Sequence, residues 1–426
     1  MRTNKIIEAI HEGRLDERLT EIYADPYIIP YEKKRYEQAL YQYNATFGAD
    51  EVEIFSAPGR SEIGGNHTDH QHGEVLAASI NRDAIAIVKK LNRPRVTILS
   101  DGYTSEIKVD IDDLDKRKSE EGTTAALIRG VLAKIQINGY SIGGFQAYIT
   151  SDVLIGAGLS SSAAFETLIG TIVSYLYNNN EISAVEIAKI GQYAENVYFG
   201  KPCGLMDQMA CSVGSLVHIN FADVKRPKIE QVQLDLDAHG YSLCITDTKG
   251  SHADLTPDYA AIPQEMKQVA EFFGKEVLGQ VSKQDILRDI PQIREKAGDR
   301  AFLRAIHFMN ENERVQQEAE ALKQDHFSEF LELVKESGNS SYKYLQNVYT
   351  SRYIRHQNLS VALAVSDMVL GKQGASRVHG GGFEGTIQAF VPENMVEDYR
   401  EAMEDIFGEG TCQVLKIRKY GGVKVL

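Results

Sequence analysis

The order of apolar and polar residues divides the chain into a helical beginning, a mixed middle and a largely helical stretch before its end. Residues 1–50 are polar and helical in character, with the clearest helix at 31–43. Alternation of apolar and polar residues then begins, which is typical of half-buried strands. It predicts strands at 52–56, 75–90, 95–100, 105–111 and 145–149.

Helical patterns return between and after these strands. A helix is expected at 123–138, and another at 163–177, whose nearly all-apolar sequence requires burial on most faces. Ser183 and Glu186 form a capping box that starts a further helix at 184–198. The remaining expected elements are strands at 216–221, 241–246, 385–391 and 414–418, and helices across 263–346 and at 395–406.

This succession of mixed and helical segments favours an α+β fold with two domains. The change of character near residues 223–227 is the predicted boundary, which gives domains at 1–226 and 227–426. Residues 1–30 form an additional helical extension of the first domain. A chain of 426 residues is long enough for each domain to bury its own core.

The amino-acid composition of the chain limits the kinds of partner that it can bind. The 46 Lys and Arg against 60 Asp and Glu give a net charge of −14, which argues against a nucleic-acid or anionic-membrane surface. The four cysteines form no CxxC pair, and no run of about 18 apolar residues occurs. The charged amino-terminal sequence has no signal-peptide core. We therefore expect a soluble, cytoplasmic protein with no membrane or nucleic-acid partner.

The segment APGRSEIGGNHTDHQHG, residues 57–73, concentrates groups that can bind a ligand. His67, Asp69, His70 and His72 fall within six residues. Their spacing is compatible with zinc but lacks a coherent fourth ligand, so it is a weak metal signal. A solvated charged loop, or a clamp for another kind of ligand, fits the same residues.

Three further segments are rich in glycine, and each has a structural and a functional interpretation. IGAGLSSSAAFETLIG, 155–170, links a strand to a helix, and its N–H groups could either hold phosphate or only form a capped turn. It matches neither a Walker A loop nor GxGxxG spacing. In NVYFGKPCGLMDQMACSVG, 196–214, Asp207 is either a helix cap or a working carboxylate. The adjacent glycines of RVHGGGFEGTIQAFV, 377–391, mark a close backbone approach or a difficult turn.

Taken together and in this order, the four segments closely resemble the galactokinase branch of the GHMP sugar and metabolite kinase family. The first matches the family pattern GRxNxIGEHTDY, GAGLSSSA the phosphate loop, PCGLMDQ the catalytic segment and RVHGGGFEG the third glycine motif. ENERV at 311–315 and DTKGSHADLTPDY, which ends at Tyr259, are also similar. The resemblance runs from about residue 35 to the end of the chain.

The resemblance implies a two-domain GHMP kinase fold. Its amino-terminal domain would be of the ribosomal-S5-domain-2-like type, with a left-handed βαβ unit, and its carboxy-terminal domain would be ferredoxin-like. The active site would lie between the domains, closed by the glycines 380–382.

The resemblance also implies a reaction, the phosphorylation of galactose by ATP and Mg²⁺ at the anomeric hydroxyl. Asp207 and Arg60 would be catalytic, and Ser162 and Glu195 would hold Mg²⁺. Asp69 would bind two adjacent sugar hydroxyls and distinguish the configuration at O4. The other sugar-binding residues would be Asn66, His67, Gly204 and Tyr259, and the phosphates would lie against Gly156, Gly158, Leu159, Ser160, Ser161 and Ser162.

The chain departs from the family pattern at several positions, all but one of them in the first motif. Asn66 replaces the usual Glu, Glu62 the usual Asn, Gly64 the usual Ile and His70 the usual Tyr, and Glu384 replaces a glycine of the third motif. Residues 1–30 have no counterpart in the pattern. We expect Asn66 to face the sugar 6-hydroxyl and to bind it less tightly than a carboxylate would. His70 and His72 are expected to be peripheral.

Two alternatives to a galactose kinase remain open at this point. One is a kinase for a modified galactose, such as galactosamine or N-acetylgalactosamine. The other is a galactose-sensing regulator of the same fold without turnover. A sensor would have no need of Arg60, Asp207, Ser162 and Glu195, which are all present. We expect a monomer whose partners are a small sugar and ATP.

Overall fold

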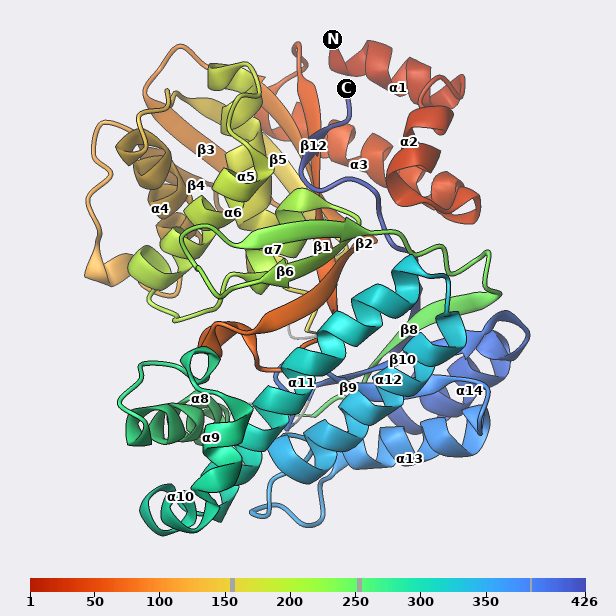
Figure 1. Ribbon diagram of the computed structural model, residues 1–426. Helices are drawn as coiled ribbons and strands as arrows, with labels where there is room; N and C mark the ends of the chain where they lie inside the picture. Colours follow the sequence, from red (N-terminus) through yellow and green to blue (C-terminus); the bar gives the residue numbers. More distant parts are fainter. Residues whose placement is uncertain (154–157, 251–254, 384) are drawn as a thin grey trace.

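The structure is a computed structural model that describes residues 1–153, 158–250, 255–383 and 385–426. Gly156 and Glu384, two residues named in the sequence analysis, lie outside these ranges. The strands within them form one sheet of eight strands and one of four, and helices pack on both sheets (Figure 1). No helix in the described ranges is long and apolar enough to cross a membrane.

The eight-stranded sheet is built around two long antiparallel strands, β1 (Glu53–Gly64) and β2 (Glu74–Lys90). One half of β2 pairs with β5 and the other half with β6. The strand order is β12-β1-β2-β5-β3-β4, with β6 and β7 added beside β2, and β3 runs parallel to β5. The other strands are β3 (Arg95–Ser100), β4 (Ile107–Asp110), β5 (Phe145–Ser151), β6 (Leu216–Asn220), β7 (Lys228–Val232) and β12 (Val423–Lys424).

Strand β1 continues well beyond its predicted end at residue 56. The predicted strand stopped short of Pro58 and Gly59, and both residue types are uncommon inside strands. The structure accommodates them in a bulge between Pro58 and Arg60, after which pairing with β2 resumes as far as Gly64. This extension carries the end of β1 toward the part of the molecule that contains the second sheet (Figure 1).

The two faces of the eight-stranded sheet carry different helices, because successive side chains of a strand point to opposite faces. Phe55 belongs to the core shared with α4, α5 and α6. Ile54 belongs to the opposite core, shared with α1, α2 and α3, so the extension 1–30 completes the sheet's second face beside β12. These helices are α1 (Thr3–His11), α2 (Asp16–Tyr23), α3 (Ile29–Phe47), α4 (Thr124–Ile137), α5 (Ser161–Asn178) and α6 (Ala184–Tyr193).

One of the two hydrogen bonds of the capping box expected before α6 is confirmed. The Ser183 hydroxyl accepts a hydrogen bond from the Glu186 N–H at 3.2 Å. The helix was predicted to continue to residue 198, but its last part, Ala194–Phe199, is a π-helix. Such a wider turn changes the direction of the side chains that follow it and is frequent at functional sites. Glu195 lies in this turn.

The four-stranded sheet has the order β11-β8-β10-β9, and all its neighbours are antiparallel. Leu243 faces α11 and α12, and Cys244 faces α13 and α14, so helices cover both faces. The strands are β8 (Tyr241–Asp247), β9 (Ala375–His379), β10 (Thr386–Pro392) and β11 (Cys412–Leu415). The helices are α8 (Thr256–Phe272), α9 (Lys283–Arg288), α10 (Ile290–Ala297), α11 (Asp299–Lys323), α12 (Phe327–Ser340), α13 (Asn358–Leu370) and α14 (Val396–Phe407).

The expected α+β class is confirmed, whereas five elements were not predicted. These are α7 (Met206–Val213), α13, β7, β9 and β12. The division at residues 226 and 227 stays a prediction. Strand pairing assigns β7, which follows that point, and β12, near the end of the chain, to the first sheet.

Candidate active site

A cavity of about 470 Å³ lies where the two parts of the molecule meet. Arg60 reaches it from β1, Ser160–Ser162 from the start of α5, and Asp207 from α7 (Met206–Val213). Gly381 and Gly382 reach it from the turn between β9 and β10. Four segments that are far apart in the sequence therefore line one space.

A carboxylate with two close hydrogen-bond donors forms one wall of this cavity. The Arg60 Nε donates to Asp207 Oδ1 at 2.8 Å, and the Ser160 hydroxyl donates to Asp207 Oδ2 at 2.6 Å. Burial alone would raise the pKa of Asp207, but the Arg60 charge and these donors hold it below its usual value. Asp207 is therefore a carboxylate at neutral pH. It lies in the first turn of α7 but caps no helix with its side chain.

The glycine- and serine-rich loop makes a sharp turn just before the amino-terminal end of α5. Gly158 and Ser160 both have positive φ, and α5 begins at Ser161. Leu159 is buried in the core, and its carbonyl accepts the Arg60 N–H at 3.1 Å. This leucine fixes the loop to β1, which leaves Ser160–Ser162 on the cavity wall.

A second group of polar side chains lies beside this loop. The Ser162 hydroxyl donates to Glu195 Oε1 at 3.1 Å, and the Gln208 amide donates to Glu195 Oε2 at 2.8 Å. Lys201 Nζ lies 3.2 Å from Glu195 Oε1. The same Gln208 amide donates to Glu166, whose pKa is raised well above its usual value by burial and by the Glu195 charge. Glu166 therefore binds a proton more readily than an ordinary glutamate does.

The Ser162 and Glu195 oxygens are compatible with the expected magnesium site. A hydroxyl and a carboxylate are hard oxygen ligands, and Mg²⁺ commonly binds through one or two such groups while keeping several waters. The two side chains lie within hydrogen-bond distance of each other, with Ser162 on the cavity wall and Glu195 buried beside it. The magnesium site itself stays a prediction.

The environment of Asn66 differs from what was expected. Asn66 is completely buried, and its amide donates to Glu62 Oε1 at 2.9 Å and to the Gly380 carbonyl at 2.7 Å. Its oxygen accepts from Asn347 at 2.8 Å and from Ser341 at 3.3 Å. Because protein groups use the polar atoms on both sides of the amide, the expected contact with a sugar 6-hydroxyl does not fit this geometry.

Asp69 lies against the segment that carries Asp207. The Asp69 Oδ1 accepts the His70 N–H at 2.8 Å, while a Cβ added to Gly204 would overlap Oδ2. Glycine at 204 is thus what allows the two segments to touch. Burial raises the pKa of Asp69 to about 7, and the nearby Asp207 charge contributes in the same direction. Asp69 is the one of these two carboxyls that changes charge near neutral pH.

The histidines of the first motif join two segments of the chain. The His67 Nε2–H donates to the Gly381 carbonyl at 3.1 Å, and its Nδ1 lies 3.4 Å from His70 Nε2. Burial lowers the pKa of His67 to about 4 and that of His70 to about 3, so both rings are neutral. Within the described residues, no group of three or more His, Cys, Asp or Glu side chains is arranged to hold a metal ion.

Tyr259 connects the start of α8 with the third glycine motif. Its hydroxyl donates to the Gly382 carbonyl at 2.6 Å, and a Cβ added to Gly381 would meet its ring. Tyr259 lines the cavity together with these glycines. The arrangement agrees with the expectation that this tyrosine and this motif share one site.

Comparisons with known proteins assign this arrangement to a family. The GHMP kinase N-terminal domain matches residues 126–215, and the galactokinase galactose-binding signature matches residues 41–90. The galactokinase of Glaesserella parasuis serovar 5 (strain SH0165) is 30% identical over 378 residues, which cover 87% of this chain and 93% of that protein. The chain belongs to the galactokinase family.

Other members and more distant structures agree. The galactokinase of Actinobacillus pleuropneumoniae serotype 5b (strain L20) is 29% identical over 386 residues, covering 89% of this chain and 95% of that protein. A crystal structure of Lactococcus lactis galactokinase complexed with galactose has a TM-score of 0.77 at 24% identity, covering 90% of this chain and 98% of that chain. A mevalonate kinase structure has a TM-score of 0.61 at 14% identity, covering 86% of this chain and 99% of that chain. As a member of the galactokinase family, this protein is an enzyme, a kinase with the two-domain GHMP fold.

Several residues that shape this galactokinase-family site were missed by sequence reasoning. Helix α11 holds the first motif in place: Glu311 accepts the Gly65 N–H at 3.2 Å, and His307 lies 2.9 Å from the Asn66 carbonyl. His307, Arg314 and Arg377 lower the pKa of Glu311 to about 2, although burial would raise it. ENERV was recognised as family-like, but nothing in its pattern indicated this role. Lys201 adjoins the recognised PCGLMDQ segment and was not considered.

Proposed function

We propose that this enzyme transfers the γ-phosphoryl group of ATP to the anomeric hydroxyl of galactose, with Mg²⁺, to give galactose 1-phosphate. The observation that carries the proposal is Asp207, an ionised carboxylate held by Arg60 and Ser160 in a cavity between two glycine-rich segments. Phosphoryl transfer depends mainly on positioning and charge stabilisation, and this constellation offers both. The galactokinase relatives support galactose as the acceptor.

The sugar would lie between the first motif and the segment around Gly204. Asp69 would accept hydrogen bonds from two adjacent hydroxyls, a geometry that distinguishes an axial from an equatorial O4. Gly204 and Tyr259 would complete the walls. His67 would act mainly by fixing Gly381 through its 3.1 Å hydrogen bond. Asn66 would contribute indirectly, by holding the Gly380 carbonyl at 2.7 Å.

The nucleotide phosphates would lie at the amino-terminal end of α5. Backbone N–H groups of the loop that contains Gly158, Leu159, Ser160, Ser161 and Ser162 suit a phosphate, because the end of a helix leaves such groups unpaired. Gly156 is proposed to belong to the same loop. Ser162 and Glu195 would hold Mg²⁺, which supplies charge neutralisation for the phosphates.

In the reaction, Asp207 orients the anomeric O–H and accepts its proton. The sugar oxygen forms a bond to the γ-phosphorus while the bond from that phosphorus to the bridging oxygen breaks, and ADP leaves. Arg60 keeps Asp207 ionised before transfer and stabilises negative charge on the transferring group. A carboxylate with a lowered pKa is a weak base, so its main contribution is to orient the hydroxyl while the proton leaves late.

A panel of hexoses tests the proposal directly. ADP release is measured with ATP and Mg²⁺ against galactose, glucose, galactosamine and N-acetylgalactosamine, and ³¹P NMR identifies the phosphorylated position. We expect the highest kcat/KM with galactose, a 1-phosphate product and loss of activity with EDTA. A preference for a 2-substituted sugar would replace galactose as the substrate, and no release with any hexose would leave a non-catalytic sensor.

A further inference from the structure

Lys201 is held over the magnesium-compatible side chains by its own backbone. The π-helix Ala194–Phe199 ends at Gly200, whose φ of 86° turns the chain back. The N–H groups of Gly200 and Lys201 both donate to the Glu195 carbonyl, at 3.0 and 3.1 Å. Positive φ favours glycine, so this turn depends on Gly200. The start of the Lys201 side chain is therefore fixed relative to Glu195.

The Lys201 side chain is much more exposed to solvent than the Glu195 side chain with which it pairs. Its Nζ lies 3.2 Å from Glu195 Oε1, yet the lysine side chain is 64% exposed and that of Glu195 only 3%. Glu195 also accepts hydrogen bonds from Ser162 and Gln208. The carboxylate is thus a fixed acceptor, whereas the ammonium group can move within the cavity that Lys201 lines.

The other cation of the cavity has no such freedom. Among the cavity-lining residues that the structure describes, Arg60 and Lys201 are the lysine and arginine side chains. Arg60 is 5% exposed, and it donates to Asp207 at 2.8 Å and to the Gly158 carbonyl. Its charge is largely offset by Asp207. A polyanionic phosphate chain entering the cavity would meet one cation that can reorient toward it, Lys201.

We propose that Lys201 is a phosphate-binding residue of the catalytic cavity, which exchanges Glu195 for an oxygen of the nucleotide phosphates. In the empty cavity its ammonium group neutralises Glu195. A divalent cation held by Ser162 and Glu195 would neutralise that carboxylate instead, which would leave Lys201 available to a phosphate oxygen. The proposal rests on the proposed function for the identity of the nucleotide and the metal, and on the contacts above for the lysine.

The exchange makes two predictions of opposite sign for Lys201→Met. Nucleotide affinity should fall about tenfold or more, because a charge-assisted hydrogen bond to phosphate is lost. Divalent-cation affinity in the absence of nucleotide should rise severalfold, because the competing ammonium group is gone. The first is measured by calorimetry with ATP and Mg²⁺ in the absence of sugar, and the second by electron paramagnetic resonance of Mn²⁺ titrated into the protein. Neither measurement requires turnover.

Two control variants separate this role from a structural one. Lys201→Arg keeps the charge and should retain nucleotide affinity within a few-fold. Lys108→Met removes an exposed lysine that forms a comparable 2.8 Å ion pair with Glu106 on the first sheet, away from the cavity, and should change neither affinity. The melting temperature of each variant is recorded as a check on folding.

The measured affinities and melting temperatures distinguish a phosphate-binding lysine from a purely structural one. Unchanged nucleotide affinity in Lys201→Met would overturn the proposal, as would a loss of both affinities together with a lowered melting temperature. Should Lys201→Met not fold, Lys201→Gln replaces it, with the same expected signs. A failure of the hexose panel with these binding results intact would reject the proposed substrate but not the phosphate-binding lysine.

Discussion

Glu62 and Asn66 illustrate how single residues adapt this family site. The family pattern has asparagine and glutamate at these two positions in the opposite order, and here the Asn66 amide donates to Glu62 Oε1 at 2.9 Å. The exchange keeps one amide–carboxylate pair and moves its negative charge from position 66 to position 62. Arg377, which is fully buried, donates to Glu62 at 2.5 Å and so provides the countercharge that a buried carboxylate needs.

Asn66→Glu should destabilise the protein. The new carboxylate would face Glu62 and the Gly380 carbonyl in a fully buried position, where unpaired charge is expensive. We expect the free energy of unfolding to fall by about 3 kcal/mol or more, measured by urea denaturation. The double variant Glu62→Asn/Asn66→Glu restores one carboxylate to the pair and should recover part of the loss. An Asn66→Glu protein of unchanged stability that binds galactose more tightly would show that residue 66 faces the sugar after all.

Asp69 predicts a pH dependence of sugar binding. Its pKa of about 7 means that the carboxylate, which accepts sugar hydroxyls, forms as the pH rises through neutrality. The KM for galactose should therefore fall by about tenfold from about pH 6 to about pH 8, measured from initial rates at saturating ATP. Asp69→Asn should bind galactose poorly and lose this dependence. A KM of the wild type that is flat across this range would contradict the assigned role.

The same group also affects stability, with a defined sign. The folded-state pKa of about 7 lies above the ordinary 3.8. The contribution of Asp69 to the free energy of unfolding is therefore complete at low pH and is lost as the pH rises from about 4 to about 7. Asp69→Asn should accordingly be more stable than the wild type at about pH 8, and the difference should shrink near about pH 5.

At the scale of elements, the strongest departure from expectation is strand β1. The alternation of apolar and polar residues predicted the strand only up to residue 56. Pro58 and Gly59 interrupt this pattern, so the rest of the strand was not predicted. The strand is buried along this length, with Gly59 against the Leu159 carbonyl of the glycine loop and Gly64 against Glu318 of α11. This burial, together with a bulge, overrides the local preference of Pro58 and Gly59. Elements with a long, undisturbed pattern, such as α5 and β2, were predicted to within a few residues. The unpredicted π-helix at Ala194–Phe199 has no known signal in residue periodicity.

The contact of α11 with the end of β1 contains an unusual buried carboxyl group. Glu318 is completely buried, and neither of its oxygens has a hydrogen-bond partner among the residues that the structure describes. A Cβ added to Gly64 would overlap Oε2. Gly64, which replaces the isoleucine of the family pattern, thus leaves the space that Glu318 fills. Burial and the Glu311 charge raise the pKa of Glu318 well above its usual value.

Glu318→Met should stabilise the protein, and more so at high pH. Because the folded-state pKa is raised, the wild type loses stability as the pH rises above the ordinary glutamate pKa of about 4.3. An apolar side chain of similar length removes that loss, and we expect a gain of about 1–3 kcal/mol at about pH 8, measured by denaturant unfolding. Glu320→Met on the exposed face of the same helix is the matched control and should change stability little. A loss of stability at both high and low pH would show that Glu318 has a polar partner in solution.

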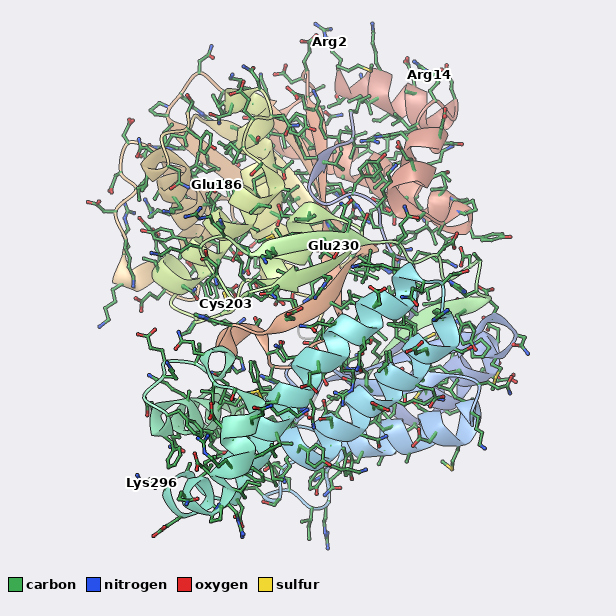
Figure 2. The ribbon with its side chains drawn as sticks, viewed as in Figure 1. Arg2, Arg14, Glu186, Cys203, Glu230 and Lys296 are labelled. Carbon is green, nitrogen blue, oxygen red and sulfur yellow. The ribbon has the colours of Figure 1, made fainter. Side chains whose placement is uncertain are left out.

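At the scale of the whole molecule, two sheet-based parts contribute one site. β1 and the loop before α5 supply Arg60 and Ser160, and the β9–β10 turn supplies the glycines opposite them. Cys203, which lies next to Gly204 and 3.7 Å from the Gln208 amide, is labelled where the upper part of the molecule adjoins the lower (Figure 2). The site thus depends on how the parts are held together, which α11 does through Glu311 and His307.

Sequence reasoning could predict those parts of the site that short motifs carry. In the structure Arg60 pairs with Asp207, and Ser162 pairs with Glu195. Asp69 lies against Gly204. The position of Asn66 could not be predicted, because its partners Asn347 and Ser341 come from a region about 275 residues away in the chain. Lys201 was likewise missed, since its proximity to Glu195 depends on the turn at Gly200.

The most direct test of the account is the kcat of Asp207→Asn with galactose, ATP and Mg²⁺. The central claim is that Asp207 orients and deprotonates the sugar hydroxyl, with its charge maintained by Arg60 at 2.8 Å. The amide cannot accept the proton, so kcat should fall by about 10²- to 10⁴-fold. Calorimetry should show galactose and ATP still binding, and the melting temperature should show an intact fold. A folded Asp207→Asn enzyme with a kcat close to that of the wild type would remove Asp207 from the reaction and contradict the mechanism.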